Sequence, residues 1–120
     1  MITISSFKDL IVWKKSRLLV KEAYLLLKQF PITERDALKF QIQKSVISIP
    51  SNIAEGYGRQ STKDNIRFLN IAKGSLYEFQ TQIDLAYDLM YISENNHIEL
   101  QKKSEEINKM LCALIKKLSA

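Results

Sequence analysis

Residues 68–90 read FLNIAKGSLYEFQTQIDLAYDLM, and their spacing decides the class of fold. Apolar side chains recur in this stretch at alternating intervals of three and four residues, as on one face of an α-helix. They are Leu69, Ala72, Leu76, Phe79, Ile83, Ala86 and Met90. Ser61 followed by Asp64 is an N-terminal capping signal. The pattern therefore predicts a helix of about thirty residues, roughly 45 Å long.

The same spacing predicts a helix on each side of the chain's centre. The first covers about residues 9–28, and the last is capped by Ser93. The apolar face of the first comprises Val12, Ser16, Leu19, Ala23, Leu26 and Phe30. That of the last comprises Leu100, Ser104, Ile107, Leu111, Leu114 and Leu118.

A further helix precedes the central one and contains a proline. We expect Thr33 to cap it, so that it starts near Glu34 and ends at the glycines of residues 56–58. Its apolar seam comprises Leu38, Ile42, Ile49 and Ile53. Because the periodicity continues across Pro50, we expect a kink there rather than two helices.

Short connections make neighbouring helices run antiparallel. The fold class predicted is therefore all-α, an up-down-up-down four-helix bundle in a single domain that spans residues 1–120. The lone Cys112 excludes an internal disulfide and any multi-cysteine metal site. No apolar run approaches the roughly 20 residues that a membrane span needs. We expect a cytoplasmic protein with no membrane partner.

No constellation in the sequence predicts an enzyme or a metal site. Glu94 and His97 have the Glu-x-x-His spacing of iron-binding bundles, but such sites need two of these pairs and more glutamates. Cys112 is expected at the edge of the core, where no histidine could activate it. We therefore predict no catalytic residue, no metal and no cofactor.

The helix of residues 34–58 also carries a polar stripe beside its apolar seam. Its members are Gln41, Ser45, Ser48, Asn52 and Glu55. Folding this helix back on the central one would place Glu55 level with Arg67, Asn52 with Asn70 and Ser48 with Gly74. We expect a partly buried Glu55–Arg67 ion pair and a close backbone approach between Ser48 and Gly74.

Basic residues are concentrated in the first helix. Residues 1–30 hold six Lys or Arg against two acids, and so carry +4 of the net charge of +5. Lys14, Arg17, Lys21 and Lys28 form one ridge at helical spacing, and the turn before the central helix adds Arg59, Lys63 and Arg67. Such clusters bind phosphates without reading bases. The alternative interpretation is a solvated lysine face.

Two helices have more apolar surface than one seam requires. The first has a second stripe through Trp13 and Tyr24. The central helix has one that comprises Ile71, Ser75, Glu78, Gln82, Leu85 and Leu89. Extra apolar faces favour self-association, because large exposed apolar patches are rare on monomers. A single wide core face is the alternative.

Several motifs together resemble a known bacterial family. They are Phe7-x-x-Leu10-x-Val12-Trp13, Phe30-Pro31, Gln41-Ile42, SIPSNIAEG at residues 48–56, Phe68-Leu69-x-Ile71-Ala72-x-Gly74-Ser75-x-x-Glu78, and Met110-Leu111-x-x-Leu114-Ile115. The family is that of the four-helix-bundle proteins encoded in intervening sequences of 23S ribosomal RNA genes. The matching Ser48, Pro50, Asn52, Glu55, Gly56 and Gly74 are interpreted as determinants of fold and packing.

The resemblance implies a ring, a homopentamer, and a distant relationship to the accessory variability proteins of diversity-generating retroelements, which bind nucleic acid. It supplies no catalytic residue. The leading interpretation is a non-catalytic homo-oligomeric accessory protein that binds RNA or DNA backbone through its basic first helix. A structural or protein-interaction scaffold without nucleic-acid binding is the alternative.

Overall fold

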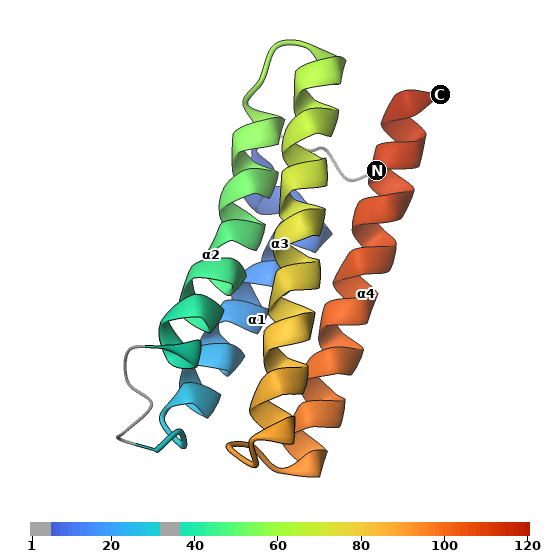
Figure 1. The fold of residues 1–120 in the computed structure, drawn as a ribbon. Helices are drawn as coiled ribbons and strands as arrows, with labels where there is room; N and C mark the ends of the chain where they lie inside the picture. Colours follow the sequence, from blue (N-terminus) through green and yellow to red (C-terminus); the bar gives the residue numbers. More distant parts are fainter. Residues whose placement is uncertain (1–5, 32–36) are drawn as a thin grey trace.

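The computed structural model describes residues 6–31 and 37–120 and contains four long helices. After a short 3-10 turn, η1 (Phe7–Asp9), they are α1 (Ile11–Leu27), α2 (Leu38–Tyr57), α3 (Thr62–Asp88) and α4 (Glu94–Ser119). The described residues contain no strand, which confirms the predicted all-α class. Figure 1 shows the α2–α3 connection at one end of the bundle and the α3–α4 connection at the other. Each helix packs on two neighbours, α1 and α3 both lying between α2 and α4.

The predicted helix starts are confirmed where the structure describes them. The Ser61 side chain accepts a hydrogen bond from the Asp64 N–H at 3.1 Å, and Ser93 accepts one from the Asn96 N–H at 3.1 Å. The predicted cap at Thr33 and the start at Glu34 lie outside the described residues. The caps at Ser61 and Ser93 satisfy amide groups that the first turn of each helix leaves without partners.

The end of α3 differs from the prediction. Met90 was assigned to the buried seam, but it is 88% exposed and has a φ of 62°. This left-handed conformation ends the helix and turns the chain towards α4. The helical period therefore does not extend to Met90, and the assignment was wrong.

The predicted apolar seams form the core of the bundle. The seam of α1 is buried along its whole length, as is that of α3 up to Ala86. In α4 the seam is buried from Leu100 to Leu111, whereas Leu114 and Leu118 are only half-buried. An apolar cavity of about 180 Å³ lies between these two leucines and Leu69 of α3. Packing is thus looser at the end of the bundle where α4 finishes.

Of the two glycines within α2 and α3, Gly56 rather than Gly74 lies where the two helices approach closely. A Cβ on Gly56 would lie 2.9 Å from Asn65 Oδ1 and 3.0 Å from both Asn65 O and Phe68 Cβ. A Cβ on Gly74 would meet nothing within 4 Å. The predicted approach of Ser48 to Gly74 was wrong by one residue, because Ser75 is the residue that turns towards α2.

Polar side chains join α2 to α3 along the predicted stripe. The Ser45 hydroxyl donates to Gln82 Oε1 at 2.6 Å, and the Ser48 and Ser75 hydroxyl oxygens lie 2.8 Å apart. Asn52 donates to the Ser48 carbonyl oxygen of its own helix at 2.8 Å, rather than pairing with Asn70. The buried polar groups of this seam are therefore satisfied, as a packed interior requires.

Pro50 lies inside α2, which continues unbroken from Leu38 to Tyr57. The sequence motif around Pro50 therefore belongs to one helix, as predicted. The kink expected at Pro50 stays a prediction.

The two helical glycines allow a paired test of this packing. We expect Gly56→Ala to lower the free energy of unfolding by about 1–3 kcal/mol, because the new methyl group crowds the Asn65 side chain, the Asn65 carbonyl oxygen and Phe68 Cβ of α3. Gly74→Ala should instead raise the free energy of unfolding by about 1 kcal/mol, because alanine has a higher helix propensity than glycine at an exposed position. Denaturant unfolding of both variants measures the difference, and equal effects would contradict the close approach at Gly56.

Two serines of α2 test the polar seam in the same way. Ser45→Ala leaves the buried Gln82 side chain without its partner, so it should cost about 1–3 kcal/mol of unfolding free energy. Ser51 is exposed and bonds only to the Ile47 carbonyl oxygen of its own helix. Ser51→Ala should therefore stay within about 0.5 kcal/mol of the parent. A matching loss in both variants would show that the Ser45–Gln82 bond adds nothing.

Candidate nucleic-acid interface

The four predicted cations of the first helix lie on its exposed face. Lys14, Arg17, Lys21 and Lys28 are all exposed, whereas the opposite face of α1 is the buried seam. From Lys14 to Lys28 the helix rises about 21 Å. The structure thus presents one straight row of positive side chains to solvent.

The acids near this row are engaged elsewhere. Glu22, the acid within α1, accepts a hydrogen bond of 2.7 Å from Lys103 of α4. Asp9 accepts the backbone N–H of Ser6 at 3.2 Å in the cap of η1. Glu22 is thus directed towards α4, and Asp9 towards the cap of η1.

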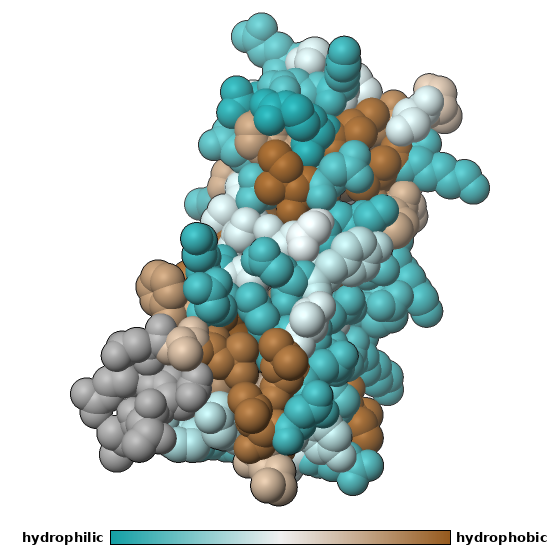
Figure 2. Space-filling model, in the orientation of Figure 1, coloured by the Kyte–Doolittle hydropathy of each residue, from teal (hydrophilic) through white to brown (hydrophobic). Residues whose placement is uncertain are grey.

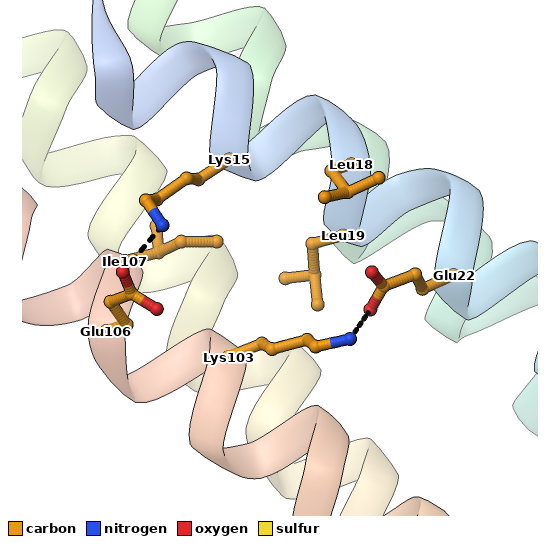
Figure 3. Close-up of a pocket in the computed structure, with 7 residues that line it drawn as sticks. All are labelled: Lys15, Leu18, Leu19, Glu22, Lys103, Glu106 and Ile107. Atoms are coloured by element: carbon orange, nitrogen blue, oxygen red, sulfur yellow. Dashed lines mark hydrogen bonds and ion pairs between the residues drawn. The ribbon is translucent and has the colours of Figure 1, made fainter.

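Figure 3 shows how α4 takes up the remaining charges of α1. Lys15, which is not in the row, pairs with Glu106 at 2.7 Å and lowers the pKa of that carboxyl. The hydrogen bond to Glu22 raises the pKa of Lys103. These two pairs bridge α1 and α4 beside Leu18. They leave the row of Lys14, Arg17, Lys21 and Lys28 without an acid of α1 beside it.

Within residues 6–31 and 37–120, the cations of the row form no ion pair. Lys14, Lys21 and Lys28 project from the helix without an acidic partner in that part of the chain. The Arg17 guanidinium carbon lies 5.6 Å from the centre of the Trp13 ring and makes a cation–π contact with it. We call these four side chains the α1 ridge.

The other predicted cations are held in a local cluster with acids. Arg59 lies 3.2 Å from Glu55 and 3.7 Å from Asp64, and Arg67 lies 2.9 Å from Asp64. Both guanidinium groups also lie 4.4 Å from the Phe68 ring centre. Lys63 is exposed, with no ion pair among the described residues. Two acids offset the two arginines, so this cluster adds little net charge to the α1 ridge.

The predicted Glu55–Arg67 ion pair is wrong. Glu55 pairs with Arg59 one turn along the same chain segment, and its side chain is 56% exposed. Arg67 pairs with Asp64, three residues earlier in α3. Each charge thus finds a partner within one helical turn, where the pair forms without the exact register between helices that the prediction assumed.

A groove runs between α1 and α2 beside the α1 ridge. It has a volume of about 380 Å³ and is mostly apolar. Its lining comprises Trp13, Arg17 and Val20 of α1 and Ile47, Pro50, Ser51 and Ala54 of α2. Trp13 and Val20 also pack against the core. The second apolar stripe predicted for the first helix is therefore partly used inside the bundle.

The second stripe predicted for the central helix is divided. Ser75 and Gln82 face α2, whereas Ile71, Leu85 and Leu89 are 41%, 46% and 52% exposed. On the central helix, Ile71 therefore lies apart from Leu85 and Leu89, so that these exposed residues form no continuous apolar face. Figure 2 shows apolar groups towards the two ends of the visible face of the bundle, with hydrophilic and neutral groups between them.

An exposed apolar row on α1 was missed. Ile11, Leu18 and Leu25 are 58%, 52% and 53% exposed and lie seven residues apart. Seven-residue spacing places side chains on one stripe of a helix and is typical of helix-to-helix seams. The signal is present in the sequence as a repeat of seven residues, on a different stripe of α1 from Trp13 and Tyr24. We call these three residues the heptad row.

The remaining candidate groups have structural partners. His97 Nε2 lies 2.7 Å from Asp84 Oδ1, and the imidazole stacks on the Tyr87 ring at 4.4 Å. In the part of the chain that is described, no three His, Cys, Asp or Glu residues gather to hold a metal ion. Cys112 is exposed, contrary to the expected place at the core edge, because it follows the buried Leu111 onto the outer face of α4. No described helix is long and apolar enough to cross a membrane.

Comparisons with known proteins agree with this architecture. The sequence model of the 23S rRNA-intervening sequence protein family matches residues 8–113. A crystal structure of a protein of unknown function from the S23 ribosomal protein family of Bacteroides thetaiotaomicron VPI-5482 is similar, with 31% identity and a TM-score of 0.82. The similarity covers 88% of this chain and 99% of that one. Among curated proteins, none matches. The relationship to retroelement accessory proteins stays a prediction.

Proposed function

This chain belongs to the 23S rRNA-intervening sequence protein family, and we propose that it is a non-catalytic, homo-oligomeric accessory protein that binds the backbone of RNA or DNA. The observation that carries the proposal is the α1 ridge. Its four exposed cations are not offset by any ion pair among the described residues. A phosphate backbone is the common cellular ligand that presents negative charges in a line.

The geometry of α1 supports backbone contact without sequence reading. Lysine and arginine side chains on a straight helix can each neutralise one phosphate, and the release of counterions drives such binding. The Arg59–Arg67 cluster is left out of the proposal, because Glu55 and Asp64 already occupy its arginines.

Self-association is the second part of the proposal, and the heptad row supports it. Three large apolar side chains, each more than half exposed, lie along one stripe of α1 next to the ridge. Burying them against another copy removes apolar surface from water. Assembly also repeats the α1 ridge once per subunit, so that several weak contacts act on one strand. The homopentamer is the assembly that the family resemblance favours.

The alternative function is a protein-interaction scaffold. The α1–α2 groove and the heptad row offer apolar contact surfaces that need no nucleic acid. Salt separates the two functions. If the α1 ridge neutralises four phosphates of a single strand, affinity should fall about 50-fold between roughly 50 and 200 mM salt.

The ridge is tested by reversing two of its charges. Lys14→Glu with Lys21→Glu should lower affinity for a generic RNA more than about tenfold and flatten its salt dependence, because at least two phosphate contacts are lost. Lys109→Glu with Lys116→Glu changes the net charge equally on the outer face of α4 and is the matched control. Fluorescence anisotropy measures both. Equal losses of affinity in the two variants would show an effect of net charge only. If the parent protein does not bind RNA at low salt, the scaffold function replaces the nucleic-acid function.

The oligomer is tested with two leucines of equal exposure. Leu18 of the heptad row and Leu89 at the end of α3 are both 52% exposed. Leu18→Glu should dissociate the assembly at micromolar concentration in sedimentation velocity, because it places a carboxylate in the apolar contact, while Leu89→Glu should not. Dissociation by Leu89→Glu but not by Leu18→Glu would assign the subunit contact to α3. A monomeric parent protein would contradict self-association.

A further inference from the structure

The α1 ridge and the α1–α2 groove share a residue. Arg17 belongs to the ridge and also lines the groove, with its guanidinium beside the Trp13 ring. A chain of phosphates held along the ridge therefore runs along one edge of an apolar groove. A group attached to the phosphate chain on the side of the groove would therefore lie in the groove.

Flat rings occur along the same side of the bundle. The groove is lined by Trp13 and Val20 of α1 and by Ile47 and Ala54 of α2. Tyr24 follows Val20 by about one turn of α1, and Phe40 precedes Ile47 by about two turns of α2, so in two antiparallel neighbours we expect both rings beyond the same end of the groove. Tyr24 is 37% exposed and Phe40 is 55% exposed. The groove itself thus holds the Trp13 ring and the guanidinium of Arg17, and Tyr24 and Phe40 add two exposed rings on the same two helices.

We infer that the groove receives unpaired bases, and that the protein prefers single-stranded nucleic acid to a duplex. The inference rests on the proposed function, since the α1 ridge must hold the phosphates. Aromatic rings and arginine planes stack on the faces of bases regardless of sequence. A duplex keeps those faces stacked inside its helix, so it can contact the ridge but not the groove. A single strand can use both surfaces.

The distribution of charge favours a strand over an acidic helical peptide. Arg17 lines the groove and belongs to the row of four exposed cations on α1, whereas the exposed residues of α2 include one cation, Lys44, and one acid, Glu55. A polyanion that carries its charge along one side and its apolar groups along the other fits this asymmetry. An acidic amphipathic helix has charges on both flanks of its apolar face and would match cations on both edges.

The sole tryptophan makes the inference testable. Trp13 lies in the groove, so its fluorescence reports occupancy there. Three ligands of equal charge are compared at low salt: a single strand of about sixteen nucleotides, its abasic counterpart and a hairpin of equal length whose stem is a duplex. We expect the single strand to quench Trp13 and to bind at least about fivefold more tightly than the other two.

Substitutions of exposed rings isolate the stacking. Tyr24→Leu keeps apolar bulk but removes the flat ring, and should reduce affinity for the single strand about fivefold or more while leaving the abasic ligand unaffected. Tyr24→Phe should bind like the parent. Tyr77→Leu, which removes a 45% exposed ring from α3, is the matched control and should have no effect.

Each outcome decides between defined alternatives. If the abasic strand and the hairpin bind as tightly as the single strand and Trp13 is not quenched, the groove takes no bases and the inference fails, while the proposed function stands. If no nucleic acid binds, both fail. Quenching by a helical peptide of glutamate and leucine, with none by the single strand, would assign the groove to a protein partner and overturn the inference.

Discussion

The contact between α2 and α3 at Gly56 is the constraint on which the other parts of the structure depend. The backbone of α2 approaches Asn65 and Phe68 so closely that no Cβ fits between them. This contact fixes the distance between the two helices, and the Ser45–Gln82 hydrogen bond fixes their register about three turns away. A buried hydrogen bond cannot slip by a residue without leaving polar groups unpaired. The pair α2–α3 therefore acts as the rigid half of the bundle.

The candidate interface depends indirectly on the α2–α3 pair, because α2 forms part of the groove. The face of α2 that lies away from α3 supplies one wall of the groove, through Ile47, Pro50 and Ala54. On its other side, α1 is joined to α4 by Lys15–Glu106 and Glu22–Lys103. Exposed ion pairs contribute little to stability. Their larger consequence is electrostatic, because they place the acid of α1 against α4 and leave the α1 ridge without a counter-charge.

Features set by a few neighbouring residues could be predicted from the sequence. The caps at Ser61 and Ser93 need only the serine and the amide three residues later. The buried seams can be predicted from the helical period alone. The same period predicts the α1 ridge, which lies on the side of α1 opposite its buried seam. The heptad row of Ile11, Leu18 and Leu25 belongs to this class too, and a search at a spacing of seven would have found it.

The sequence by itself determined which residues are helical, which face of each helix is buried and which face of α1 is basic, because periodicity along one chain decides these properties. Only the tertiary structure decided which residues meet between helices. A rotation of one residue, about 100° on a helix, exchanges Gly74 for Ser75 as the partner of Ser48. The pairing of Glu55 with Arg59 rather than Arg67, and the groove beside the ridge, likewise depend on how two helices are rotated and shifted against each other. Side-chain packing over the whole interface selects that arrangement, and no single stretch of sequence contains it.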